Sequence, residues 1–124
     1  MIVADTCIWI EFLKGKEPFF SDMTELLEHG QILGIEIVFA ELMQGAKNKR
    51  ERELISDYWN FLPKFSMDTL LFRAGVMSAQ EKWFAKGVGL IDCAILMYCR
   101  ESGSPLWTKD KKLLSICKKD DVYN

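Results

Sequence analysis

The chain has 124 residues, with 16 Lys and Arg, 18 Asp and Glu and one His, so its formal net charge is −2. Hydrophobic residues make up 49% and charged residues 27%, which is the balance of an ordinary globular protein. Charged residues interrupt every apolar run well short of the ~20 residues that a membrane-spanning helix needs. The near-neutral charge also argues against a protein that coats nucleic acid by bulk charge.

Short apolar runs alternate with longer helical patterns along the chain. Strands are predicted at residues 2–4, 31–35, around 65, at 106–108 and, as an edge strand, at 122–123. Helices are predicted at residues 6–14, 18–29, 49–61, 68–86, 89–101 and 111–117, with Asp68 as the N-cap of the fourth of these. A further helix is predicted to pass through Glu41 and to end near Gly45. This alternation predicts a parallel sheet covered by helices on both faces. With no repeat or Pro/Gly-rich linker, we expect a single domain over residues 1–124.

The four cysteines indicate a reducing environment. Cys7, Cys93, Cys99 and Cys117 form no closely spaced pair, and the lone His29 is far from all of them in sequence. This spacing disfavours a zinc site or a disulfide framework. The opening MIVAD has no basic leader before its first carboxylate, so we expect a cytoplasmic protein with free thiols.

Four acidic residues stand where solvated charges do not belong. Asp5 directly follows the first strand, and Glu41 is embedded in IVFAELM. Asp92 is the only charge in GLIDCAILMYC, and Asp110 follows the predicted strand that ends in Trp107 and Thr108. An ionised carboxylate among apolar neighbours is costly unless something compensates it.

Each acid alone has an ordinary structural explanation. Asp5 and Asp110 suit helix N-caps, and Asp92 suits the first turn of a helix, where the helix dipole favours an anion. Glu41, inside its helix, calls for a partner. Because all four lie at strand ends or on following helices, they are expected at one edge of the sheet, where Mg²⁺ or Mn²⁺ would offset their repulsion. Thr6 and Thr108 add hydroxyl groups beside two of these acids, and such a site suits phosphodiester hydrolysis.

The sequence resembles a PIN domain, and within that family a VapC-type toxin ribonuclease of bacterial toxin–antitoxin pairs. The segments that carry the resemblance are IVADTCIWIEFL at residues 2–13, AELMQG at 40–45, GLIDCAI at 89–95 and LWTKD at 106–110. Their order and spacing cover nearly the whole chain. The resemblance implies a three-layer α/β/α sandwich with a central, mostly parallel sheet.

The resemblance also implies functional roles for individual residues. Asp5, Glu41, Asp92 and Asp110 would bind Mg²⁺ or Mn²⁺, with Thr108 supporting the site. The protein would be an endoribonuclease that forms a homodimer and binds a small antitoxin. Two departures stand out: Cys7 replaces the common Ser or Asn, and Lys111 and Lys112 follow Asp110 where some relatives carry another acid.

Positive charge gathers in two segments that are candidates for RNA contacts. The predicted phosphate-binding residues are Lys47, Lys49, Arg50, Lys109, Lys111 and Lys112, although a solvated basic face explains the same clusters. The four tryptophans have the spacing of core residues. Only Trp107, next to Thr108, is considered as a base-stacking residue.

Other functions remain open at this point. A haloacid dehalogenase-type phosphatase would need a second acid at the position of Cys7, and a receiver domain would need an Asp at the end of a central strand. A PIN-type RNA-processing nuclease that is not a toxin, or a catalytically silent module that binds RNA or protein, would share most of these residues.

Overall fold

The structure is a computed structural model that describes residues 1–124. Its central element is a parallel pair of short strands, β1 (Val3–Ala4) and β2 (Leu106–Trp107), with Val3 opposite Leu106. Single parallel bridges continue this pair outward, from Ile2 to Ile32, from Gly34 to Lys64 and from Leu106 to Val122. The extended segments therefore lie in the order 64, 32–34, 2–4, 106–107 and 122, all parallel.

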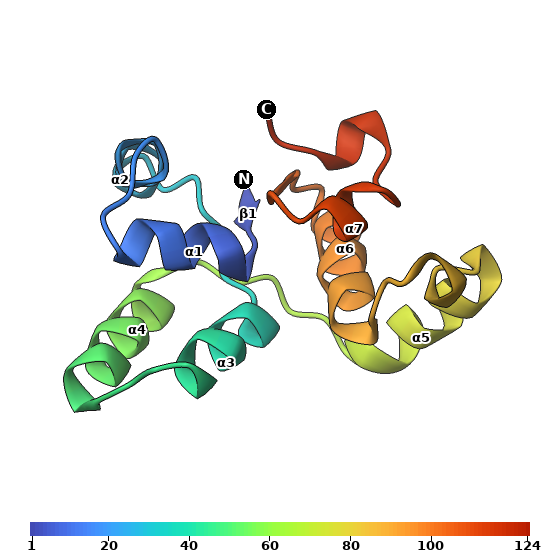
Figure 1. The fold of residues 1–124 in the computed structure, drawn as a ribbon, viewed down its shortest axis with the longest axis horizontal. Coiled ribbons are helices and arrows are strands. Elements are labelled where there is room, and N and C mark those ends of the chain that lie inside the picture. The colour runs from blue at the N-terminus through green and yellow to red at the C-terminus, as the bar shows by residue number, and fades with distance from the viewer.

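Helices connect and cover these segments. In chain order they are α1 (Thr6–Leu13), α2 (Phe19–Glu28), α3 (Glu36–Gln44), α4 (Lys49–Phe61), α5 (Leu70–Glu81), α6 (Leu90–Ser102) and α7 (Lys111–Leu114), with short 3-10 turns η1 (Phe84–Lys86) and η2 (Lys119–Asp121). Figure 1 shows β1 near the middle, with α1 to α4 on one side of the view and α5 to α7 on the other. The expected α/β architecture with a parallel sheet is confirmed.

One hydrophobic cluster of 28 buried residues holds these elements together. The most deeply buried helix is α6, in which every residue from Cys93 to Cys99 is buried. Asp92 therefore sits at the entrance of a helix that is apolar nearly all round, as its sequence predicts. No helix in the structure is both long enough and apolar enough to cross a membrane.

Several predicted strands and helix ends differ from those in the structure. The strands expected at residues 31–35, near 65 and at 122–123 pair only at single bridges. Asp68 does not cap α5, since Thr69 takes the N-cap position in a left-handed conformation with φ of 53° and the helix begins at Leu70. The predicted helix 68–86 ends at Glu81, because Lys82 is also left-handed, with φ of 58°.

The order of the extended segments creates a switch point beside β1. From β1 the chain moves outward through residues 32–34 to 64, and it then returns to the other side of β1 as β2. In parallel α/β sheets a crevice opens at such a switch point, outside the carboxyl ends of the strands. Asp5 follows β1 and Thr108 follows β2 at that edge.

Candidate metal centre

Asp5 is both a helix cap and a buried carboxylate between the two central strands. It is 6% exposed, and its Oδ1 accepts a hydrogen bond of 2.8 Å from the amide of Thr6, at the start of α1. Its Oδ2 accepts a 2.7 Å bond from the Thr108 hydroxyl, at the end of β2. The capping explanation is therefore correct for one oxygen, while the other is oriented by a residue 103 positions away.

Thr6 connects Asp5 to the second acid. The Thr6 hydroxyl donates a hydrogen bond of 2.6 Å to Oε1 of Glu41 on α3. Because the Thr6 amide is bonded to Asp5 at the same time, one residue sets the relative positions of two carboxylates. Glu41 is exposed on its helix, so this contact orients a side chain that packing alone would leave free.

Asp110 repeats the arrangement of Asp5 at the other strand. Its Oδ1 caps α7 by accepting bonds from the amides of Lys112, at 2.9 Å, and Leu113, at 3.1 Å. Its own amide donates a 3.1 Å bond to the Thr108 hydroxyl oxygen. Thr108 thus contacts both Asp5 and Asp110.

Asp92 interacts electrostatically with the other three acids. Its partial burial, and then the charges of Asp5, Asp110 and Glu41, raise the pKa of Asp92 from 3.8 to about 6. No hydrogen bond or cation contributes in the opposite direction. The other three acids predicted from the sequence therefore lie near enough to Asp92 for their charges to affect its pKa.

None of these four carboxylates forms an ion pair. The salt bridges of the protein join Lys49 to Glu53, Arg73 to Glu101, Arg100 to Asp121 and Lys109 to Glu11. At the same time, no group of three or more acidic, His or Cys side chains lies close enough together to hold a metal ion. The acids converge on one region without being drawn into a closed ligand set.

Cys7 borders the same region as a neutral thiol. Its Sγ lies 3.6 Å from Oδ2 of Asp5 and 3.7 Å from the Thr108 hydroxyl, which are weak contacts for sulfur. Burial, with a smaller contribution from the charge of Asp5, raises the pKa of the Cys7 thiol. Cys7 therefore adds no further negative charge near neutral pH. All four cysteines are free thiols.

The basic residues predicted to contact RNA fall into different environments. Lys109 lies 3.6 Å from Glu11 and above the Phe19 ring, so its amine already has partners. The side chain of Glu11 is only 15% exposed. The side chains of Lys111 and Lys112 are free of ion pairs.

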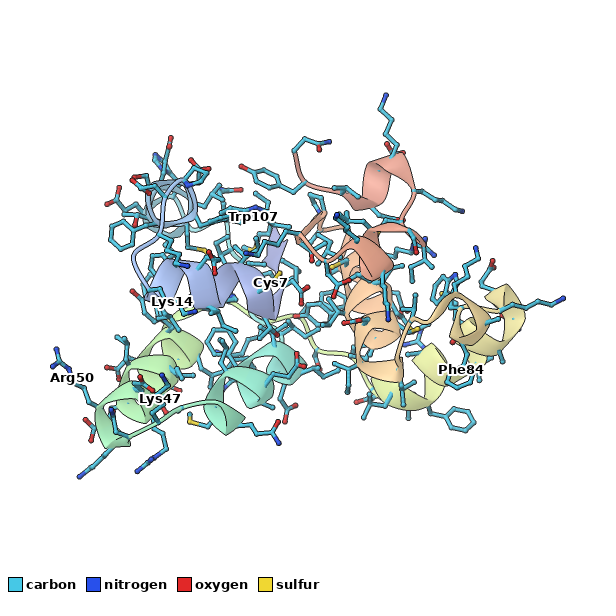
Figure 2. The ribbon with its side chains drawn as sticks, viewed as in Figure 1. Cys7, Lys14, Lys47, Arg50, Phe84 and Trp107 are labelled. Carbon is cyan, nitrogen blue, oxygen red and sulfur yellow. The ribbon has the colours of Figure 1, made fainter.

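The other basic segment lies beyond Glu41. A groove of about 400 Å³ lies between α1, α3 and α4, and the residues that line it include Glu41, Lys14 and Lys47. Figure 2 shows Lys14, Lys47 and Arg50 together on one side of Cys7, with Phe84 on the other side. Lys14 was not among the predicted RNA contacts, because at the end of α1 it has no basic neighbour in sequence except Lys16.

Aromatic side chains near the site are mostly structural. Trp107 packs against Phe19 and Tyr123, and Trp9 and Trp83 are 1% and 4% exposed. The core interpretation of the tryptophans therefore fits better than base stacking by Trp107. The most exposed aromatic ring is Phe84, at 84%, which the sequence analysis placed inside the expected helix 68–86 and did not consider as a functional residue.

The fold and the arrangement of acids define an α/β protein with an acidic edge, and comparison with known families agrees. The family model of the PIN domain matches residues 2–119, so the chain belongs to the PIN domain family. This confirms the resemblance and removes the phosphatase and receiver alternatives. Two relatives, both named ribonuclease VapC32, come from Mycobacterium tuberculosis strains CDC 1551 / Oshkosh and ATCC 25618 / H37Rv. The chain is 28% identical to each over 125 residues, covering 98% of this chain and 94% of the relative.

Proposed function

We propose that this protein is a divalent-metal-dependent endoribonuclease and the toxin of a toxin–antitoxin pair. The observation that carries the proposal is the convergence of Asp5, Glu41, Asp92 and Asp110 without a cationic partner from the protein. A structural cluster would be expected to contain its own counter-charge. The names of the relatives support RNA as the substrate.

The donor atoms fit Mg²⁺ or Mn²⁺ in chemistry. Carboxylate and hydroxyl oxygens are the hard ligands that these ions prefer, and no thiolate or imidazole competes, because Cys7 stays protonated. Carboxylates repel one another in the absence of a cation, so a bound ion is what would draw them within ligand distance. Asp5, Glu41, Asp92 and Asp110 would hold it.

The chain's own residues prepare the reaction by orientation. When bound, the ion supplies Lewis-acid polarisation of a phosphoryl oxygen and lowers the pKa of a coordinated water. Thr108 holds Asp5 at 2.7 Å, and Thr6 holds Glu41 at 2.6 Å, so two carboxylates are oriented before substrate arrives. Lys111, Lys112, Lys47, Lys49 and Arg50 contact backbone phosphates on either side of the scissile bond.

Removal of divalent metal tests the proposed mechanism. We expect purified protein to cleave a mixed-sequence single-stranded RNA in Mg²⁺ or Mn²⁺, to lose this activity in EDTA, and to regain it when excess metal is added back. The readout is gel separation of fluorescent RNA fragments. Equal cleavage in EDTA and in Mg²⁺ would contradict metal dependence, and no cleavage under any condition would favour the catalytically silent module.

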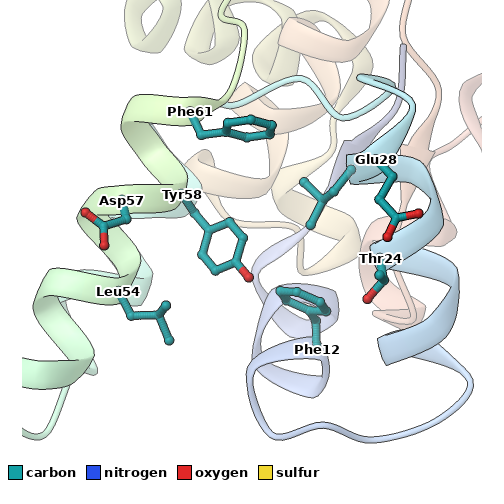
Figure 3. A pocket seen from close by; sticks show the side chains of 8 residues that line it. Phe12, Thr24, Glu28, Leu54, Asp57, Tyr58 and Phe61 are labelled. Carbon is teal, nitrogen blue, oxygen red and sulfur yellow. The ribbon is translucent and has the colours of Figure 1, made fainter.

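The antitoxin that the resemblance implies would place a basic side chain into the acidic site, and we propose that it also contacts a second surface. An apolar pocket of about 520 Å³ lies between α1, α2 and α4. Figure 3 shows the rings of Phe12 and Tyr58 turned toward it, with Glu28 and Asp57 coming from the helices on its two sides. An apolar floor with acidic side chains beside it suits an amphipathic helix that carries basic residues. We propose this pocket as the antitoxin contact, and a homodimer as the state of the toxin.

Growth in a bacterial host separates a toxin from an RNA-processing nuclease. Expression of the intact chain is expected to arrest growth, and co-expression of a small antitoxin encoded in the neighbouring reading frame should restore it. The Asp92→Asn variant, expressed to the same level, is the control and should not arrest growth. Normal growth with high levels of active wild-type enzyme would favour the RNA-processing alternative.

A further inference from the structure

Phe84 is an aromatic ring that the fold exposes rather than buries. It is 84% exposed, the highest value among the large hydrophobic residues that the surface presents. It begins η1, between Trp83 and Val88, which are 4% and 1% exposed. The exposed ring is thus carried by a turn whose neighbours are fixed in the core.

Backbone hydrogen bonds make this turn well defined. The amides of Lys86 and Val88 bond to the Trp83 carbonyl at 2.9 and 3.2 Å, and the amide of Gly87 bonds to the Phe84 carbonyl at 3.0 Å. Gly87 has φ of 79°, a conformation that closes the turn and that other residues rarely adopt. A ring on such a turn loses little conformational freedom when it binds a ligand.

Positive charge predominates around Phe84. Lys82 and Lys86 flank it, both exposed, and the acids nearest to it in sequence are Glu81 and Asp92. A third lysine reaches the turn from another element, because the Lys112 side chain lies 3.8 to 3.9 Å from the point where a Cβ on Gly87 would stand. None of these three lysines forms an ion pair.

The turn is linked on two sides to the acidic site. Lys112, whose side chain lies over Gly87, donates its amide to Asp110. Downstream, the turn leads through Gly89, the N-cap of α6, into the helix whose first turn carries Asp92. These two links connect the turn that carries the ring and the lysines to the elements that carry Asp110 and Asp92.

We propose that Phe84 stacks on a nucleobase of single-stranded RNA next to the scissile phosphate, while Lys82, Lys86 and Lys112 bind the adjoining phosphates. The inference rests on the proposed nuclease function and adds a substrate-binding residue to it. Stacking fits because every base has an aromatic face, and a base paired within a duplex is not free to leave its neighbours. A second copy of the chain fits less well, since a two-fold contact here would set the same lysines against one another.

Binding measured without metal tests this inference apart from catalysis. A fluorescein-labelled single-stranded RNA is titrated in EDTA with the full-length chain, and anisotropy is recorded. Phe84→Ala is expected to raise Kd about tenfold, as loss of one stacked base does. Phe84→Trp should bind like wild type and Phe84→Leu should not, because stacking needs a flat ring. In cleavage with Mg²⁺, Phe84→Ala should raise KM more than it lowers kcat.

The matched control is Phe72→Ala, which removes another ring, 76% exposed, from α5, away from the lysines. It should leave the RNA Kd unchanged. Wild-type affinity in Phe84→Ala or Phe84→Leu would overturn the inference while leaving the nuclease intact. A change of Phe84→Ala from dimer to monomer in sedimentation would assign the ring to contact between copies and would also overturn it. Absence of RNA binding and cleavage by the wild type would instead refute the proposed function.

Discussion

Replacing Asp92 with Asn is expected to stabilise the metal-free protein and to abolish RNA cleavage. The charged Asp92 carboxylate is costly in the folded protein, because it is partly buried and faces the charges of Asp5, Asp110 and Glu41. A shift of one pKa unit corresponds to about 1.4 kcal/mol, so the full shift of Asp92 would correspond to about 3 kcal/mol. Because Asp92 is partly exposed, solvent screening reduces the destabilisation by its charge to roughly 1.5 kcal/mol. The dipole of α6 stabilises the charged form of Asp92 by about 0.5 kcal/mol. We therefore expect a net gain of about 1 kcal/mol, or about 4 °C in Tm.

The pH dependence of this gain follows from the direction of the pKa shift. The pKa of Asp92 is raised to about 6 in the folded protein, from 3.8. Its protonation therefore contributes stability that is fully present below the unfolded value and is lost as pH rises through about 6. Thermal melts of wild type and Asp92→Asn in EDTA should differ most above pH 7 and converge toward pH 4.

The matched control is Asp22→Asn. Asp22 is also in the first turn of a helix, α2, but it is exposed and lies away from the other acids. Its replacement loses only the favourable interaction with the helix dipole, so Tm should fall slightly and cleavage should be unchanged. A lower Tm for Asp92→Asn than for wild type in EDTA would show that Asp92 is an ordinary stabilising residue rather than a metal ligand.

The second large effect is expected for Asp5→Asn, which separates capping from catalysis. Asn keeps a side-chain oxygen for the Thr6 amide, so the helix cap is retained, but its NH2 group replaces the oxygen that accepts from Thr108. The loss of that bond is expected to lower the free energy of unfolding by about 1 kcal/mol. The variant loses one negative charge between β1 and β2. Cleavage should fall more than about 100-fold, since loss of an outer-shell partner alone typically costs about 10–100-fold. Circular dichroism, melting and RNA cleavage in Mg²⁺ measure the two properties separately.

The same chain offers the reverse substitution as a control. Asn48 caps α4 by accepting a 2.9 Å bond from the Glu51 amide. Asn48→Asp should leave stability near wild type, whereas its new negative charge between Lys47 and Lys49 should weaken RNA binding without abolishing cleavage. If Asp5→Asn retained full cleavage, Asp5 would be a helix cap only, and the proposed metal site would have to be built from other residues.

Much of the fold was predictable because local patterns and tertiary packing agree. The helix α4 has the predicted bounds, and α6 begins and ends within one residue of them, since both have clear apolar spacing and end signals. The strands were harder to place, because residues 32, 34, 64 and 122 pair at single bridges that depend on distant partners. The break after Glu81 was missed because a left-handed Lys82 leaves no mark in composition.

The sequence by itself singled out the four acids of the proposed site. Asp5, Glu41, Asp92 and Asp110 stand out because a carboxylate next to apolar residues or a strand end must have a reason, and that argument needs no coordinates. Tertiary structure decided how they relate. Thr108 bonds to Asp5 across 103 positions and Thr6 bonds to Glu41 across 35, while Glu11 forms an ion pair with Lys109. It also decided that Phe84 is exposed beside Lys112, because exposure depends on what the rest of the chain covers, which local sequence does not encode.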